Sequence, residues 1–274
     1  MRSIDLYDSM NRNYVVIFLL IVLSSCTSKF AKIQKSNDYE YKYKMADEYS
    51  AAKRYVYAQQ LYEEVIPFLK GTSKYESLFY KLAYSYYNQE DYVNAENLFK
   101  TFTETFPSSN HAEECEFMRS LVYYKQSPKV DLDQTNTTKA VGLLQAFIST
   151  HPTSSKVKEA SDLIDACREK LELKEFKGAE LYYNLGFYKA SAVAFNSLLE
   201  DFPDSKHGDE YKLTIIKSDY KYAELSYEIK QKERFEKVIT EYSDFKERYP
   251  DSKLLNDAKE FSSLAQNFLN NIKK

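Results

Sequence analysis

The stretch FYKLAYSYYNQEDYVNAENLFKTFTETFPSS, residues 79–109, decides the fold of this 274-residue chain. Its apolar and small residues recur at intervals of three and four, as they do on one face of a helix. A polar segment at residues 88–91 separates two such runs, and a proline follows the second run. Because the residue before a proline avoids the α region, we expect the second helix to end at Phe106. The stretch therefore predicts two helices joined by a turn.

The proline that closes this unit recurs three more times along the chain. The four prolines are Pro107, Pro152, Pro203 and Pro250. They are separated by 45, 51 and 47 residues. A serine stands two residues after each proline, and we expect it to cap the next helix, for about 1 kcal/mol. The four serines are Ser109, Ser154, Ser205 and Ser252. Each junction thus predicts the end of one helix and the start of another.

The residues before each proline recur as well, with large, small and aromatic side chains at helical spacing. In the stretch quoted above, the recurring set is Phe79, Leu82, Ala83, Tyr86, Tyr92, Ala95, Phe99 and Pro107. This set resembles the tetratricopeptide repeat, a helix–turn–helix unit of 34 residues. The small residues allow a neighbouring helix to approach closely. A generic helical bundle has the same periodicity and stays the alternative.

The repeat pattern extends over most of the chain. A first repeat fits Tyr39 to Lys70, and the third carries the insertion QSPKVDLDQTN at residues 126–136. The fourth opens with a long helix from Ser154 to about Asn184, and the fifth runs from Asp219 to Pro250. A last helix from Asn256 to Lys274 caps the array. The sequence therefore predicts an all-α, tetratricopeptide-like helical repeat solenoid of about five helix pairs plus a C-terminal capping helix.

The N-terminal region carries an export signal. Arg12 precedes an apolar run from Tyr14 to Leu23, which has the length of a signal-peptide core and is too short to span a membrane. The LSSC motif at its end resembles the lipobox of bacterial lipoproteins. We expect residues 1–25 to be a lipoprotein signal peptide, Cys26 the lipid attachment site, and residues 26–37 a lipidated linker. An ordinary cleaved signal and a short uncleaved anchor are the alternatives.

The residue after the cysteine indicates which membrane holds the lipid anchor. Thr27 stands where an aspartate often retains lipoproteins in the inner membrane. We therefore expect a lipid anchor in the outer membrane, with the protein on its periplasmic face.

The chain carries few residues suited to catalysis or metal binding. Its formal net charge is −3, whereas nucleic-acid binding favours a basic surface. None of His111, His151 and His207 stands at metal-ligand spacing from a second ligand, and no glycine-rich phosphate loop is present. We expect no enzyme, no metal, no cofactor and no nucleic acid. Cys115 and Cys167 lie at apolar helical positions, so we expect buried free thiols, although an oxidising periplasm would allow a disulfide.

Tyrosines offer the best candidate for a binding surface. Tyr80, Tyr84 and Tyr87 fall on one helical stripe, apart from the packing set of their repeat. The corresponding positions of the neighbouring repeats hold Tyr43, Phe117 and Tyr124. A groove lined with aromatic rings suits peptide capture, because the rings give apolar area and the hydroxyls give hydrogen bonds. The alternative is that these side chains pack against neighbouring repeats.

Three longer segments resemble the BamD family of outer-membrane β-barrel assembly lipoproteins. FMRSLVYY at residues 117–124 is similar to the family's YMRGLxYY-like helix. DQTNTTKAVGLLQAFISTHPTS at residues 133–154 is similar to its DxxxxxxAxxxFxxLxxxYPxS segment. LELKEFKGAELYYNLGFYKASAVAFNSLLEDFPDS at residues 171–205 resembles its long fourth-repeat segment.

The resemblance implies two roles. The N-terminal repeats, residues 38–152, would form a substrate-side groove that holds an extended segment of unfolded outer-membrane β-barrel proteins. The C-terminal repeats, residues 153–274, would dock the periplasmic domains of the central barrel subunit, alongside accessory lipoproteins, mainly between Tyr188 and Lys274. Arg119 matches an arginine of the family motif, and it would pair with a peptide carboxylate or support its helix. The alternative function is another envelope scaffold lipoprotein, associated with cell division or peptidoglycan.

Overall fold

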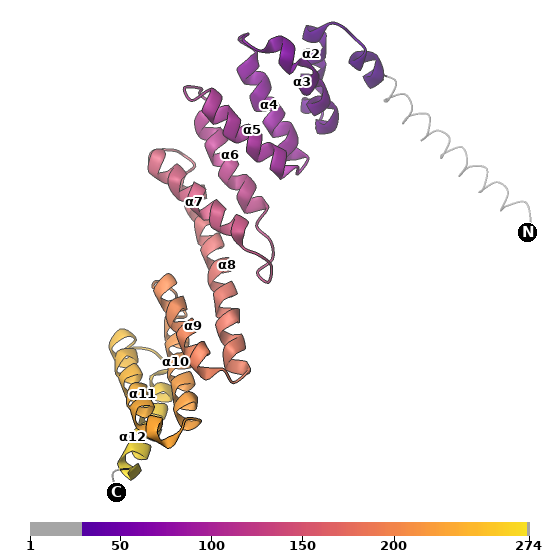
Figure 1. Ribbon diagram of the computed structural model, residues 1–274. Coiled ribbons are helices and arrows are strands. Elements are labelled where there is room, and N and C mark those ends of the chain that lie inside the picture. The colour runs from indigo at the N-terminus through magenta and orange to yellow at the C-terminus, as the bar shows by residue number, and fades with distance from the viewer. Residues whose placement is uncertain (1–28, 273–274) are drawn as a thin grey trace, which may run out of the picture. The chain divides into compact units, whose positions relative to one another are not determined.

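All regular secondary structure in the described part of the chain is helical. The computed structural model describes residues 29–272, so the expected signal peptide and Cys26 lie outside the described residues. None of the helices in this range combines the length and apolar character needed to cross a membrane. The helices, labelled in Figure 1, are α2 (Tyr39–Ala51), α3 (Tyr55–Leu69), α4 (Tyr75–Asn88), α5 (Tyr92–Thr105), α6 (Ala112–Lys125), α7 (Thr135–Thr150), α8 (Val157–Asn184), α9 (Tyr188–Asp201), α10 (Gly208–Glu224), α11 (Glu228–Arg248) and α12 (Leu255–Ile272).

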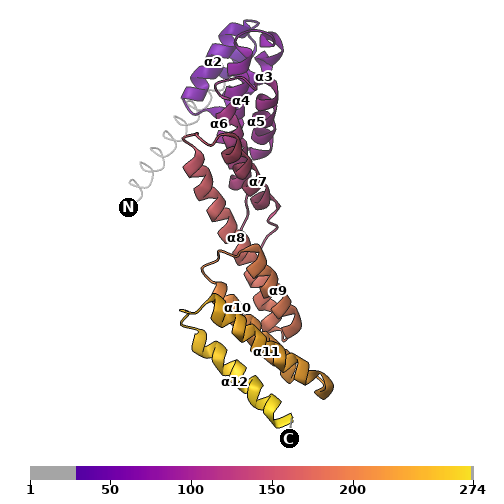
Figure 2. The same cartoon turned by 90° about the vertical axis from the view of Figure 1, so that its left-hand side faces the viewer.

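The helices pack in the order in which they follow one another along the chain. α2 contacts α3, α4 contacts α5, α6 contacts α7 and α10 contacts α11, while α12 packs on both α11 and α10. α8 and α9 share a core cluster that includes Ala179 and Phe195. Figures 1 and 2 both show α10, α11 and α12 side by side. These five pairs and the last helix confirm the expected all-α repeat architecture.

The small residues of the recurring pattern lie where the two helices of a pair meet. In the second pair, Ala83 on α4 and Ala95 on α5 are fully buried, together with Phe99. Because alanine carries only a methyl group, the two helices lie close together and the phenyl ring fills the space beside them. The corresponding positions hold Ala46 in α2 and Ser191 in α9, which are also fully buried.

Most helix ends lie where the sequence predicts them. α5, α7, α9 and α11 each end two residues before a proline, at Thr105, Thr150, Asp201 and Arg248. The predicted long helix is α8, and the predicted insertion lies between α6 and α7. The predicted start of the fifth pair is wrong. α10 begins at Gly208 rather than Asp219, because this pair is longer than the 34-residue unit used to place it.

The expected capping role of the junction serines is wrong. Each serine instead forms a hydrogen bond with a carboxylate of an earlier helix, a contact that we call a serine tie. The N-cap residue of α6 is His111, whose side chain makes no cap hydrogen bond. Ser109 Oγ accepts a hydrogen bond from the backbone N–H of His111 at 3.0 Å and donates one to Glu76 Oε1 at 2.6 Å. The other junctions repeat the pattern, with hydrogen bonds from Ser154 to Glu113, from Ser205 to Glu172 and from Ser252 to Asp209. Each serine thus joins the turn between two pairs to the first helix of the earlier pair.

Three turns within pairs share a left-handed residue. Lys53, Glu90 and Gly186 have φ values of 57°, 60° and 79°. At each turn two backbone N–H groups reach back to the end of the preceding helix, as when Asp91 N–H donates to the carbonyl of Tyr86 at 3.1 Å. This is the hydrogen-bonding pattern with which helices commonly end. Glycine adopts the left-handed conformation without strain, whereas lysine and glutamate do so at a cost.

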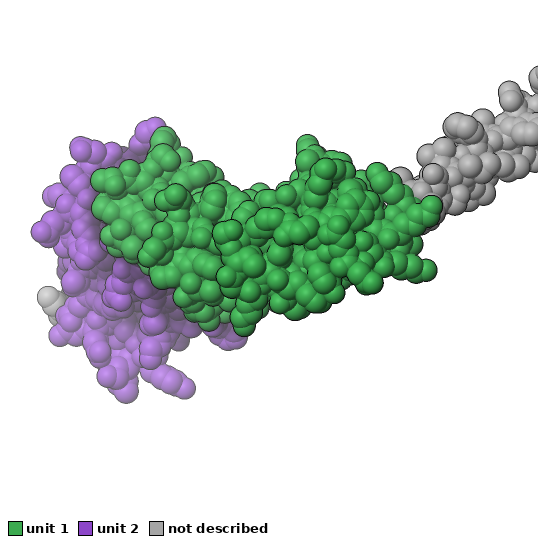
Figure 3. Space-filling model, turned by 90° about the horizontal axis from the view of Figure 1, so that it is seen from above, with its two compact units in different colours: residues 1–127, 135–164 green, residues 128–134, 165–274 purple. Residues whose placement is uncertain are grey.

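The chain divides into two compact units, coloured in Figure 3. Unit 1 comprises residues 1–127 and 135–164, and unit 2 comprises residues 128–134 and 165–274. The division falls within α8 rather than at the expected boundary after residue 152. Residues 128–134 of the inserted segment belong to unit 2, where Asp131 accepts hydrogen bonds from Lys174 at 2.9 Å and Lys177 at 2.8 Å.

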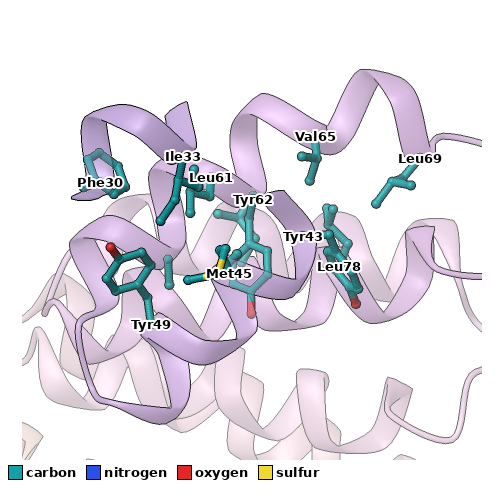
Figure 4. Packing of buried hydrophobic residues seen from close by; sticks show 13 residues of the cluster. Phe30, Ile33, Tyr43, Met45, Tyr49, Leu61, Tyr62, Val65, Leu69 and Leu78 are labelled. Carbon is teal, nitrogen blue, oxygen red and sulfur yellow. The ribbon is translucent and has the colours of Figure 1, made fainter. Parts of the chain in front are cut away.

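Each unit has its own apolar core. The first cluster of unit 1, shown in Figure 4, includes Phe30 and Ile33 from helical backbone at residues 29–34. Part of the expected linker is therefore packed on the first repeat. Cys115 in unit 1 and Cys167 in unit 2 are buried free thiols, as expected. Burial raises the pKa of the Cys115 thiol to about 12.

Candidate functional site

Two tyrosine hydroxyls of α4 bind one carboxylate of α6. Tyr80 donates to Glu114 Oε2 at 2.9 Å, and Tyr84 donates to Glu114 Oε1 at 2.5 Å. Both rings are half-buried, so each keeps an exposed part. A carboxylate that accepts hydrogen bonds at both oxygens has a fixed orientation. The contact therefore aligns the first helices of the second and third pairs.

Further rings extend this contact along α4. The Tyr80 ring stacks on the His111 ring with centroids 4.2 Å apart, and it lies 4.8 Å from the Tyr84 ring. Tyr87, also half-buried, meets the Tyr92 ring edge-on at 5.9 Å. Tyr80, Tyr84 and Tyr87, here called the tyrosine stripe, thus form a continuous aromatic surface on α4.

The stripe presents neutral hydroxyls beside negative charge. Burial, followed by the hydrogen bond to Glu114, raises the pKa of Tyr80 to about 12. The same two causes raise the pKa of Tyr84. The pKa of Tyr87 is raised by burial and then by the nearby Tyr92 and Glu159. The stripe therefore offers protonated hydroxyls and aromatic faces beside the carboxylates of Glu114 and Glu159.

Tyr43, Tyr80 and Phe117 occupy corresponding positions, 37 residues apart, and each contacts the region where the next pair begins. Tyr43 is 9% exposed, and its hydroxyl accepts a hydrogen bond from Lys81 at 3.0 Å. Phe117 is 1% exposed and lies 5.1 Å from Lys156 Nζ. Burial excludes Phe117 from direct contact with a peptide in this conformation, which corrects its assignment to the groove. For Tyr43 and Phe117 the burial favours the alternative of packing between repeats.

The other two candidates lie on α6. Arg119 Nε is 2.7 Å from Glu96 Oε1 on α5. The guanidinium is therefore engaged within the protein, which favours the supporting role over pairing with a peptide carboxylate. Tyr124, the position that corresponds to Tyr87, is half-buried near the end of α6. It keeps an accessible part and stays a candidate.

Sequence reasoning missed Glu114 and His111. Glu114 lies 34 residues after Tyr80, and Asp47 lies 34 residues before its partner Lys81. A search for complementary polar residues at the repeat length of 34 residues would have paired Tyr80 with Glu114. Tyr43, Tyr80 and Phe117 recur every 37 residues, and that spacing does not lead from Tyr80 to Glu114.

Unit 2 carries an exposed apolar surface at the turn between α8 and α9. We define the apolar patch as Leu181, Tyr182, Leu185, Phe187 and Val193, whose exposed fractions lie between 45% and 59%. It borders an open cavity of about 660 Å³ that is also lined by Tyr222 of α10. Clustered exposed apolar side chains are typical of protein–protein contact surfaces. The expected docking region begins at Tyr188. Four of the five patch residues precede Tyr188, and Val193 follows it.

Comparison with known proteins gives two distant structural alignments and one family match. The TPR2AB-domain:pHSP90 complex of yeast Sti1 aligns at 9% identity and a TM-score of 0.39, covering 83% of this chain and 98% of that one. A putative kinesin light chain of Podospora anserina with TPR-like repeats aligns at 11% identity and a TM-score of 0.33, covering 77% and 95%. These alignments are too distant to bear on function. No curated protein matches the sequence significantly. The family model of the YfiO outer membrane lipoproteins matches residues 35–235. The chain therefore belongs to the YfiO family of outer membrane lipoproteins, in which BamD is also placed.

Proposed function

We propose that the protein is a non-catalytic subunit of the machine that folds outer-membrane β-barrel proteins and inserts them into the membrane. A lipid on Cys26 would hold it to the periplasmic face of the outer membrane. Family membership supports the location, and the helical repeats support a role in binding other proteins. Unit 1 would receive unfolded barrel proteins, and unit 2 would dock the periplasmic domains of the central barrel subunit and its accessory lipoproteins.

The tyrosine stripe is the main observation in support of substrate binding by unit 1. Its three rings are half-buried, so they offer apolar area without being mobile. Tyr80 and Tyr84 are oriented by Glu114, which reduces the entropy lost when a ligand settles on the rings. An extended peptide with aromatic or aliphatic side chains fits such a surface.

The charge beside the stripe indicates which peptides would bind there. Glu114 and Glu159 place negative charge near the rings, and Arg119 is occupied by Glu96. A peptide with lysine, arginine or free backbone N–H groups near its apolar residues would be favoured. A terminal carboxylate would be repelled. The substrate segment would therefore bind through its side chains and N–H groups rather than through its chain end.

The apolar patch of unit 2 supports the second role. A partner that covers these five exposed apolar side chains removes their surface from water, which favours binding. A folded periplasmic domain with a complementary apolar surface would cover the patch and close the adjacent cavity. The patch, together with helices α9–α12, is the proposed docking region.

Peptide binding tests the role of unit 1. A labelled peptide from the C-terminal strand of a barrel protein should bind about thirtyfold more weakly to Tyr80→Ala with Tyr84→Ala, since each lost ring of a binding hot spot costs about 1 kcal/mol or more. Tyr227→Ala, an exposed position of unit 2, is the matched control and should bind normally. An amidated peptide should bind at least as tightly as the free acid. Equal binding by the double variant and the control would refute the stripe as the peptide site.

Depletion in cells separates the proposed function from its alternative. Loss of an assembly subunit should reduce the amount of all outer-membrane barrel proteins. Loss of a scaffold for division or peptidoglycan should instead give chained or misshapen cells with normal barrel levels.

A gentle detergent pull-down should recover a barrel protein with repeated periplasmic domains. If the Phe187→Glu variant no longer recovers that barrel protein, docking is assigned to the apolar patch. Val93→Glu, at an exposed apolar position of unit 1 and outside the docking region, is the control.

A further inference from the structure

Residues 29–34, which begin three positions after Cys26, are fixed to the first repeat. Helical backbone at residues 29–34 presents Phe30 and Ile33 to the core, where they are 8% and 2% exposed. The Phe30 ring lies 4.5 Å from the Tyr57 ring and 5.8 Å from the Tyr49 ring. Figure 4 shows Phe30 and Ile33 among the other side chains of this cluster. The first repeat therefore follows wherever this short helix is held.

The outward side of the same helix is basic. Lys29, Lys32 and Lys35 are exposed, and residues 29–37 contain no acidic side chain. Among residues 29–272, these three lysines have no carboxylate within ion-pair distance, although the chain as a whole carries an excess of acidic residues. Free positive charge thus gathers where the apolar side of the helix is already buried.

The turn between α2 and α3 carries two further basic residues. Lys53 and Arg54 are exposed there. The Arg54 guanidinium lies 5.2 Å from the Tyr57 ring and 5.7 Å from the Tyr49 ring, the two rings that also hold Phe30. The turn and the short helix therefore meet at the same end of the first repeat. We call Lys29, Lys32, Lys35, Lys53 and Arg54 the basic end.

We propose that the basic end binds the anionic headgroups of the membrane that holds the lipid of Cys26. This inference rests on the proposed lipid anchor. Cys26 precedes Lys29 by three residues, which span at most about 11 Å of extended chain. An anchored cysteine thus keeps the start of the short helix within little more than one Debye length of the headgroups, where clustered lysine and arginine attract anionic lipids. Because acyl chains already supply the affinity, the basic end fixes how the first repeat meets the membrane surface.

Lysine footprinting tests this contact in the full lipidated protein. The protein is added from detergent to vesicles of phosphatidylcholine, with or without phosphatidylglycerol, and treated with a membrane-impermeant acetylating reagent. Lys29, Lys32, Lys35 and Lys53 should react about fivefold more slowly on the anionic vesicles. High salt should abolish this protection. Lys158, an exposed lysine of α8, is the control and should react equally on both vesicles.

Charge variants separate headgroup binding from simple shielding. Lys29→Gln, Lys32→Gln and Lys35→Gln together should abolish the protection of Lys53, whereas the same three changes to arginine should preserve it. Equal labelling of Lys53 in the two triple variants would overturn the proposal. Protection that occurs in native envelopes and not on anionic vesicles would assign the basic end to an acidic protein partner, and would also overturn it.

The mass of the N-terminal peptide tests the anchor separately. An unmodified Cys26 would overturn the lipid anchor and the headgroup proposal together. A lipidated Cys26 with unprotected lysines would overturn the headgroup proposal alone and leave the proposed function standing.

Discussion

The hydroxyl of Tyr80 on α4 donates a hydrogen bond to Oε2 of Glu114 on α6, 34 residues further along the chain. The same separation joins Lys81 on α4 to Asp47 on α2, at 2.8 Å. The first helices of neighbouring pairs therefore meet at a separation of one repeat length, although the junction prolines lie 45 to 51 residues apart. These contacts place the tyrosine stripe at a boundary between repeats.

Alkaline pH should weaken the boundary between α4 and α6. The pKa of Tyr80 is raised from 10.0 to about 12 by burial and by Glu114. Between these values the folded chain keeps a proton that the unfolded chain has lost, so the free energy of unfolding falls as pH rises. The fall between about pH 8 and about pH 11 should be smaller in Tyr80→Phe, as measured by urea denaturation.

The exposed Tyr227 provides the control for this titration. Tyr227→Phe should retain the full dependence of stability on pH. If Tyr80→Phe lost as much stability as the unchanged protein over the same pH range, the hydroxyl of Tyr80 would not be the group responsible.

Gly208 should be intolerant of a side chain. A Cβ at this position would lie 2.5 Å from the hydroxyl oxygen of Tyr249 and 3.2 Å from its Cζ. We expect Gly208→Ala to lower the free energy of unfolding by about 1–3 kcal/mol, because α10 or the Tyr249 ring must shift. Adding Tyr249→Phe should recover part of the loss, since it removes the nearest atom. Thermal or chemical denaturation measures both effects.

Two helical glycines are matched controls for this substitution. Around Gly142 in α7 and Gly178 in α8, an added Cβ meets nothing within 4 Å. Since alanine favours the helix over glycine, each change to alanine should stabilise the protein by up to about 1 kcal/mol. A loss of stability at Gly208 no larger than at these sites would show that the close approach to Tyr249 is unimportant.

The left-handed turn residues should respond oppositely to glycine and alanine. Glu90 has φ of 60° and Gly186 has φ of 79°. Glu90→Gly should stabilise the protein and Gly186→Ala should destabilise it, each by about 1 kcal/mol, because only glycine adopts this conformation without steric cost. Urea denaturation of both variants provides the measurement. A loss of stability in Glu90→Gly would mean that the glutamate side chain contributes more than its backbone strain costs.

Lys212 should be the most sensitive charged residue of unit 2. Its side chain is 5% exposed and forms ion pairs with Glu241, at 2.5 Å, and with Asp244. Lys212→Met should lower the free energy of unfolding by about 3 kcal/mol, because it removes the nearest cation from Glu241, whose side chain is 15% exposed, and one of two cations from the half-buried Asp244. Adding Glu241→Gln should restore part of that loss. Calorimetry or urea denaturation would follow the series.

The exposed pair of Lys158 and Asp162 is the control for this buried pair. Lys158→Met should change stability by less than about 1 kcal/mol, since exposed ion pairs contribute little. Similar losses at Lys158 and Lys212 would show that burial does not set the sensitivity of these lysines.

The helix ends could be predicted because local rules set them. At the four junctions the proline excludes the preceding residue from the helix, so α5, α7, α9 and α11 end where the sequence indicates, whereas Pro67 lies inside α3. The long α8 and the buried thiols follow from similarly local patterns. The start of α10 at Gly208 was missed because the length of that pair depends on packing with α11 and α12, which no local pattern records.

The partners of polar residues could not be predicted in the same way. Ser109 stands at a typical capping position, but its hydroxyl bonds with Glu76, 33 residues earlier. Tyr80 and Phe117 occupy corresponding positions, yet only Tyr80 keeps an exposed part, because different residues face them from the next repeat. Exposure is set by such neighbours, so the extent of the candidate site followed from the structure alone.

The four serine ties have a consequence for how the protein unfolds. Each one links a turn to a carboxylate 33 to 43 residues earlier in the chain, so it couples only adjacent pairs. In such an array cooperativity is the sum of nearest-neighbour couplings rather than the property of one central core. Cutting a tie, as in Ser252→Ala, should therefore let the terminal segment fray before the rest melts, and hydrogen exchange would record a gradient of protection from the end inward.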